Sequence, residues 1–434
     1  MTAQTGELAV EPVSARPWFL NIDAIGAAAP VVVLIVVGTL RKGAFFKPDV
    51  IVLPCLCLAL ALTSPAVLRW LRVHVVALAA GVLATAWWLV DAAVWKHDVE
   101  SWRMPATWIC AAAGYGVVRA LPAVARRVVA LAATIIGFAV SVVGLGLVAA
   151  RSATWTWADE RSLRLQGPLT YPSAIGLYLL VTLLASMEVW RRESGRTAEL
   201  ASAVRAVIML GVVATDSRGA LVGLLVLVCF RSVRAELGPA IFAAVVAAPV
   251  LLYGQRDGVR SLLIAAAGVI AIAVVLVPNT LLRRGIRLIA IPALVAAGWL
   301  LATQHHAVSG LDASWTERGH ILRGALTVFG GHPLLGAGPD PWIPTKTLTG
   351  LPGIDAFAHN EPLELLISVG LVGTAVIVAA AAVVVRHLRL HRRTIVGPLA
   401  TAVLAAGLVD FVWHFAALGL LCGAAAATAT LDRR

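Results

Sequence analysis

The chain has 434 residues, of which 60% are hydrophobic and only 13% are charged, and its mean hydropathy is +0.89. A soluble globular chain of this length carries roughly twice that density of charge, so the composition excludes that class. The net charge of +12 does not indicate nucleic-acid binding, because the basic residues stand in short bunches between apolar runs and no basic amphipathic helix accompanies them. The cysteines fall within apolar runs, match no metal or redox motif, and are interpreted as buried apolar residues.

Long apolar runs without an ionisable side chain, such as 128–150 and 262–277, make up most of the sequence. A bilayer core about 30 Å thick is crossed by about 20 residues of helix, and a helix satisfies its backbone hydrogen bonds without water. The runs lack the alternation of polar and apolar residues that marks a membrane barrel. The sequence therefore predicts an all-α integral membrane protein, a polytopic helical bundle of about 12–14 transmembrane helices with one large extracytoplasmic loop.

In chain order, the first segment, 1–21, lacks the basic region and cleavage site of a secretory signal peptide and is expected to be cytoplasmic. Transmembrane helices 1–11 are expected between residues 22 and 303. A large polar loop, 304–361, with a short helix at 318–329, separates them from the C-terminal helices at 362–430 and a tail at 431–434. The expected spans are 22–40, 49–68, 74–95, 104–120, 129–150, 171–190, 199–216, 218–231, 239–253, 260–279, 286–303, 362–385, 394–410 and 412–430.

The distribution of Lys and Arg among the connections predicts the orientation. Most bunches of arginine fall on one side, together with Arg433 and Arg434, and this side is expected to face the cytoplasm. Both termini then lie in the cytoplasm, and the connections 41–48, 151–170 and 304–361 face the exterior. The first of these is basic and violates the rule. Its charge suits an anionic lipid head group, although ordinary phospholipid contact or a wrong local topology would also explain it.

A few ionisable residues lie within the expected spans, where charge is costly and often functional. The run Asp216-Ser217-Arg218-Gly219 interrupts a long apolar stretch on the outward side. A guanidinium there offers a fixed fork of donors that suits a phosphate or diphosphate. The alternative is a local ion pair with Asp216 that caps the following helix.

The large loop holds a second group of polar residues. Arg318 stands fourteen residues before a glycine-rich run, 332–338 (HPLLGAG), and His359 and Asn360 stand where the loop re-enters the membrane. A histidine takes up a proton near neutral pH, as activation of a hydroxyl requires. The alternative is a structural or interfacial histidine.

Three stretches together resemble the O-antigen ligase and polysaccharide polymerase superfamily. They are 215–223 (TDSRGALVG), Arg318 with the HPLLGAG run, and 359–373 (HNEPLELLISVGLVG). Their order, spacing and loop context carry the resemblance, which covers about 205–430. The N-terminal half is similar only as a series of apolar spans.

The resemblance implies a GT-C-type fold and a metal-independent, inverting glycosyltransferase without a cofactor. Its donor would be a glycan on undecaprenyl diphosphate and its acceptor a hydroxyl of a glycan, lipid or protein, at the outer face of the bacterial cytoplasmic membrane. Arg218 and Arg318 would hold the diphosphate, and His359 would orient or deprotonate the acceptor. The remaining residues that it suggests, for substrate binding or support, are Arg323, Asn360, Glu364 and Asp410.

Within the superfamily the sequence does not separate a ligase from a repeat-unit polymerase. A transporter or flippase of lipid-linked sugar is the main alternative from another class, and a membrane scaffold is a third. A transporter would place its polar groups near the bilayer midplane and would show inverted repeats or matching broken helices. The sequence shows no such repeat, and its polar groups gather toward the outer face, which favours the transferase.

Overall fold

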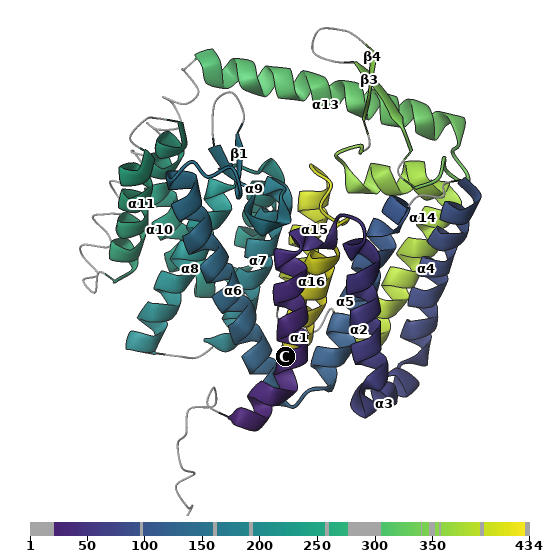
Figure 1. The fold of residues 1–434 in the computed structure, drawn as a ribbon, viewed down its shortest axis with the longest axis horizontal. Coiled ribbons are helices and arrows are strands. Elements are labelled where there is room, and N and C mark those ends of the chain that lie inside the picture. The colour runs from purple at the N-terminus through teal and green to yellow at the C-terminus, as the bar shows by residue number, and fades with distance from the viewer. Residues whose placement is uncertain are drawn as a thin grey trace, which may run out of the picture.

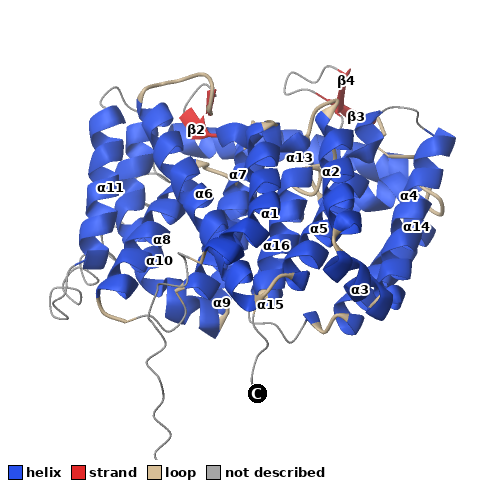
Figure 2. Cartoon of the chain, turned by 60° about the horizontal axis from the view of Figure 1, so that its bottom comes forward, coloured by secondary structure: helices blue, strands red, loops and turns tan. Residues whose placement is uncertain are grey.

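A computed structural model describes residues 21–95, 99–158, 163–190, 194–256, 260–276, 305–339, 341–346, 352–355, 357–390 and 395–429. Helices make up most of this part of the chain, and both strand pairs lie at one end of the helical bundle (Figure 2). The longer helices are α1 (Ile22–Leu40), α2 (Asp49–Thr63), α3 (Pro65–Val73), α4 (Val75–Trp95), α5 (Arg103–Ala120), α6 (Ala123–Ala149), α7 (Pro172–Val189), α8 (Arg196–Ala214), α9 (Arg218–Cys229), α10 (Arg231–Arg256), α11 (Arg260–Leu276), α13 (His305–Gly331), α14 (Glu361–His387), α15 (Val396–Gly407) and α16 (Ala416–Thr428).

Seven helices of the described residues are long and apolar enough to cross a bilayer, which confirms the helical, multi-pass character of the chain. The predicted number was 12–14, and several predicted spans are shorter in the structure. Four shorter apolar helical stretches, 218–229, 262–276, 396–407 and 416–428, have 12–15 residues, about 18–23 Å at 1.5 Å per residue, which is less than a bilayer core. The predicted span 49–68 is instead α2 and α3, bent by 88° at Ser64, and the predicted span 286–303 lies outside the described residues.

The core of the bundle is built around α7, in which every residue is buried. Helices α6, α8, α9 and α16 pack against it. Small residues allow close approach elsewhere: a Cβ at Gly423 of α16 would lie 2.0 Å from the carbonyl oxygen of Ala111 in α5. Packing through small residues is how membrane helices gain contact without a hydrophobic driving force.

The predicted loop 304–361 contains more regular structure than its sequence indicated. Helix α13 begins at His305 rather than 318 and lies across one end of the bundle (Figure 1). After it, β3 (Ile343–Lys346) pairs antiparallel with β4 (Pro352–Asp355). A second antiparallel hairpin, β1 (Thr156–Ala158) with β2 (Leu163–Leu165), lies at the same end, whereas α1 begins at the opposite end.

Helix α14 is broken at Gly370, and the HPLLGAG run fills the break. The amides of Ala337 and Gly338 donate to the carbonyls of Ile367 and Ser368, at 2.8 and 3.0 Å. Below the break, the amides of Leu371 and Val372 donate to the carbonyls of Pro333 and Leu334, at 2.9 and 3.1 Å. These four bonds replace the helical bonds that the break removes, so the run fastens the end of α13 to α14.

Replacing Gly370 by Ala should destabilise the protein strongly. Gly370 has φ +64° and ψ −173°, a region that is essentially restricted to glycine, and a Cβ there would lie 2.3 Å from the carbonyl oxygen of Leu334. The backbone strain alone costs about 1–3 kcal/mol, and the overlap adds to it. Thermal unfolding in detergent measures the loss. Gly26→Ala, in an open position of α1, is the matched control, and an equal midpoint for both variants would contradict the role of the break.

Candidate active site

Two breaks, each between consecutive helices, bring polar residues to one region of the bundle. Helices α8 and α9 are separated by residues 215–217, and α15 and α16 by residues 408–415. Ser217 caps α9, since its hydroxyl accepts the amide of Ala220 at 3.1 Å. Helix α9 packs against α15, so the two interruptions belong to neighbouring helices. The sequence predicted an interruption at 216–219 and a boundary between spans near residue 411, and in the structure each is a break between helices.

The carboxylate of Asp410, in the break between α15 and α16, is the centre of a hydrogen-bonded cluster. Oδ1 accepts from the hydroxyl of Tyr171 and from the amide of Phe411, and Oδ2 accepts from the hydroxyl of Ser173. The hydroxyl of Ser217 donates in turn to Ser173 at 2.8 Å. The Asp410 side chain is 3% exposed, so these donors replace most of its water.

His359 approaches the same carboxylate from the loop that precedes α14. Its Nδ1 lies 3.2 Å from Oδ1 of Asp410, and its ring packs edge-on against Phe411. The side chain is 22% exposed, so Nδ1 faces the carboxylate while part of the ring remains accessible. His359 has φ +51°, an uncommon conformation for a residue with a side chain, which turns the chain from the loop into α14.

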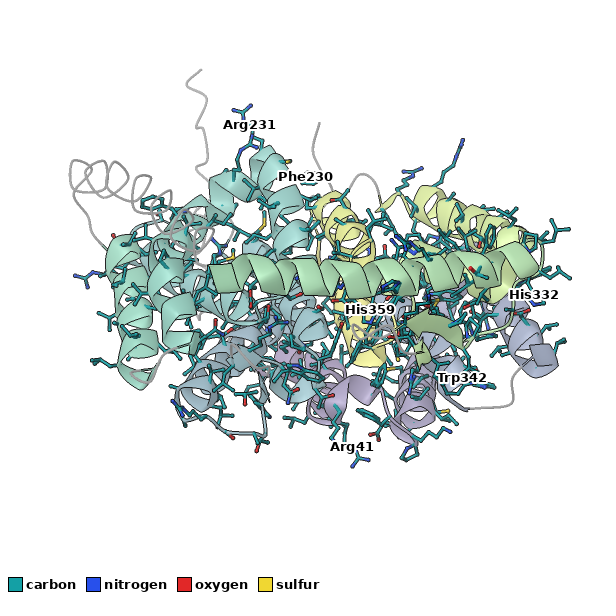
Figure 3. All side chains as sticks on the ribbon, turned by 90° about the horizontal axis from the view of Figure 1, so that it is seen from above. Arg41, Phe230, Arg231, His332, Trp342 and His359 are labelled. Atoms are coloured by element: carbon teal, nitrogen blue, oxygen red, sulfur yellow. The ribbon has the colours of Figure 1, made fainter. Side chains whose placement is uncertain are left out.

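Arg318 reaches the cluster from α13. Its Nη1 donates to the carbonyl of Val409 at 2.7 Å, and its Nη2 lies 3.8 Å from Oδ2 of Asp410. Its side chain is 27% exposed, so part of the guanidinium remains available to a ligand. Seen from above, α13 crosses the end of the bundle with His359 beside it (Figure 3). We call Asp410, Tyr171, Ser173, His359 and Arg318 the Asp410 cluster.

Arg218, the first residue of α9, completes the set that the sequence predicted. It interacts electrostatically with two arginines, Arg318 and Arg164, and with two carboxylates, Asp216 and Asp410. The cap of α9 is Ser217, and Asp216 forms an ion pair with Arg164 on β2, with Nε and Oδ2 3.5 Å apart. The structure thus brings Arg218, Arg318 and His359 together around Asp410.

The surroundings of Asp410 favour its ionised form. Burial raises the pKa of Asp410, but the hydrogen bond and charge of His359 and the hydroxyls of Ser173 and Tyr171 lower it, and the net pKa lies below the usual value of an aspartate. Burial and the charge of Asp410 raise the pKa of Tyr171 well above its usual value, so the phenol remains a donor. A carboxylate next to a histidine holds Nδ1 as the donor and stabilises the imidazolium.

Two of the other predicted residues, Asn360 and Glu364, lie where they can support the loops of the cluster. Asn360 caps α14 by accepting the amide of Leu363 at 2.9 Å, and it donates to the carbonyl of Leu408 at 2.9 Å. Glu364 is buried, and its Oε2 accepts the amide of Ala358 at 2.7 Å. Both therefore position the loops that carry His359 and Asp410. Arg323 is exposed on α13 and lies about 140° around the helix from Arg318, at 100° per residue, so the structure does not bring it to the cluster.

Two participants in the cluster, Tyr171 and Ser173, are missing from the sequence prediction. Tyr171 and Ser173 flank the first residue of α7, and their only sequence signal is a polar Tyr-Pro-Ser run where the connection 151–170, which was expected to face outward, meets the next span. Glu361 and His414 form a buried pair, with Nδ1 and Oε1 3.5 Å apart, and Glu361 also accepts the amide of Trp413. This pair fastens the second half of the 408–415 break to α14.

Among the described residues, no group of three or more His, Cys, Asp or Glu side chains is arranged to hold a metal ion. The side chains that gather here supply a hydrogen-bonded Asp–His pair and two guanidinium groups. Such a set can take a proton from a hydroxyl and stabilise negative charge on a nearby ligand. The chain matches no protein-family model, and no curated protein is detectably similar to it.

Proposed function

We propose that the chain is a membrane glycosyltransferase of the O-antigen ligase type. It transfers a glycan from undecaprenyl diphosphate to an acceptor hydroxyl at the outer face of the bacterial cytoplasmic membrane. The observation that carries the proposal is the Asp410 cluster, in which His359 and Arg318 come from distant parts of the chain to contact one buried carboxylate. Arg218 lies within electrostatic range of the same carboxylate.

His359 acts as the base for the acceptor. Because its Nδ1 faces the carboxylate of Asp410, its Nε2 is the nitrogen that takes the proton of the acceptor hydroxyl. The oxygen of that hydroxyl attacks the anomeric carbon and forms the new glycosidic bond as the bond from this carbon to the diphosphate oxygen breaks. Attack from the side opposite the leaving group inverts the anomeric configuration. Asp410 stabilises the imidazolium that results.

Arg218 and Arg318 act on the leaving group. The diphosphate keeps the electron pair of the bond that breaks, so negative charge develops on its oxygen in the transition state. Two guanidinium groups held at the end of the bundle stabilise this charge without reorganising, which is the largest contribution that such a site makes to the rate. The fork of donors on each also matches the geometry of phosphate oxygens.

The position of the cluster favours a transferase over a transporter. The residues that contact Asp410 come from α13, from the start of α7 and from the loop before α14, which all belong to the end of the bundle that α13 covers. A transporter places its site near the bilayer midplane, between two repeats. Repeat-unit polymerisation would use the same donor chemistry, and the product distinguishes it from ligation.

Purified protein in proteoliposomes should release undecaprenyl diphosphate in step with formation of an inverted glycosidic bond, when given a lipid-linked glycan and an acceptor. EDTA should leave the rate unchanged, because the proposed charge stabilisation comes from arginines. A strict requirement for a divalent metal would contradict this mechanism. Movement of intact lipid-linked glycan across the bilayer, without release of the diphosphate, would favour the flippase instead.

A further inference from the structure

Asp216 holds an unusual position between α8 and α9. Its φ is +46°, a left-handed conformation in which aspartate is among the more tolerated residues, and its side chain is 33% exposed. The turn directs Oδ2 to within 3.5 Å of Nε of Arg164 on β2. Asp216 therefore pairs with the arginine of the hairpin and also acts on Arg218, the arginine that begins α9.

The hairpin is fixed at this place by a buried glutamine from α10. Nε2 of Gln255 donates to the carbonyl of Leu163 on β2 at 2.9 Å and to the carbonyl of Ala214, the last residue of α8, at 2.7 Å. The residue is 1% exposed. One side chain thus ties the strand that carries Arg164 to the helix end that precedes Asp216, so their proximity is built into the fold.

Among the described residues around Arg218, counting Arg218 itself, there are three arginines and two carboxylates. Arg218 interacts electrostatically with two arginines, Arg318 and Arg164, and with the carboxylates Asp216 and Asp410. Asp410 already accepts hydrogen bonds from Tyr171 and Ser173 and contacts His359. Among the described residues, Asp216 is a carboxylate that pairs with Arg164 and also acts on Arg218.

We propose that Asp216 is a resident counter-anion which a diphosphate displaces, so that Arg164 passes from the carboxylate to a phosphate. This inference rests on the proposed function and extends the donor site from two arginines to three, the third on the β1–β2 hairpin. Displacement makes Asp216 a competitor of the ligand. Its removal should strengthen binding of the ligand, whereas loss of a merely structural ion pair would leave binding unchanged or weaken it.

Binding of inorganic pyrophosphate to the purified full-length protein tests the inference, measured by calorimetry with orthophosphate in parallel. Asp216→Asn keeps the size of the side chain and a residue type that accepts positive φ, and removes the charge. We expect it to bind pyrophosphate about 5-fold more tightly, the factor that corresponds to about 1 kcal/mol for a partly exposed ion pair. Arg164→Gln should bind about 5-fold more weakly, and Arg151→Gln, an exposed arginine of the same connection, should bind as wild type.

The double variant separates competition from general electrostatics. If Asp216 competes for Arg164, the gain from Asp216→Asn should shrink in the Arg164→Gln background. Asp216→Asn alone should lower the KM for the undecaprenyl-diphosphate-linked donor by a larger factor than it changes kcat. Weaker or unchanged pyrophosphate binding by Asp216→Asn, or an undiminished gain in the double variant, would overturn the inference while leaving the donor site in place. The diphosphate site itself would be overturned if the wild type did not bind pyrophosphate. It would also be overturned if binding of pyrophosphate survived the loss of both Arg218 and Arg318.

Discussion

Asp410→Asn should reduce transfer by about 10²–10⁴-fold while the protein still inserts and folds. The substitution keeps the shape of the side chain but removes the charge that faces His359 and Arg318. An amide in this place no longer fixes Nδ1 of His359 as a donor or stabilises the imidazolium, which is the effect on which Asp–His pairs depend. The hydroxyls of Tyr171 and Ser173 would also compete for one acceptor oxygen.

Rates with saturating donor, compared at matched expression and matched unfolding midpoint, measure the effect of Asp410→Asn. Asp23→Asn, an exposed aspartate at the start of α1, is the control for loss of one carboxylate. The pKa of Asp410 in the folded protein lies below the usual value of an aspartate. The carboxylate is therefore ionised at any pH above the usual value, and it loses its charge only as the pH falls through its lower pKa in the folded protein. The activity of the wild type between pH 6 and 8 should therefore not follow the titration of Asp410. A fully active Asn variant would remove Asp410 from the mechanism.

Lysine in place of Arg218 or Arg318 should lower kcat by about 10²–10³-fold, since loss of one preorganised donor to a developing charge has this effect. Lysine keeps the positive charge but loses the planar fork that contacts two oxygens at once. At Arg318 it also loses the geometry that now bonds the carbonyl of Val409 and reaches Asp410 at the same time.

Arg323→Lys is the matched control for both substitutions, because Arg323 is on the same helix as Arg318 but on its exposed side. It should retain activity within about 2-fold, as surface substitutions usually do. The comparison uses initial rates of undecaprenyl diphosphate release. Equal activity of Arg218→Lys, Arg318→Lys and Arg323→Lys would show that charge alone is sufficient and would contradict recognition by the guanidinium fork.

The class of the fold and the outline of the site were within reach of the sequence. Apolar runs predict membrane helices because the bilayer admits few other structures, and polar interruptions in those runs are costly enough to mark a function. Arg218, Arg318 and His359 were found in this way and through the family resemblance. In the structure they surround one carboxylate.

The role of Asp410 could not be predicted in the same way. Its partners Tyr171 and Ser173 lie more than 230 residues away along the chain, and only packing of α7 against α9 and α15 brings them together. Local sequence located the boundary in the run 394–430 but not its extent: the expected spans 394–410 and 412–430 meet near residue 411, whereas residues 408–415 separate α15 from α16 in the structure. The length of α13 was underestimated because its first half contains Ser309, Gly310, Asp312 and Ser314, residue types that are typical of loops.

Complementation of a strain deleted for this gene tests the central claim most directly, with wild type and His359→Ala compared at matched expression. Envelope glycan is profiled by length, and undecaprenyl-linked intermediates are quantified. We expect the variant to lose the polymer or its attachment and to accumulate the lipid-linked precursor, and the missing glycan would distinguish ligation from polymerisation. A His359→Ala variant that restores the glycan as well as wild type would contradict the proposed base, and a deletion that leaves all glycans unchanged would contradict the transferase itself.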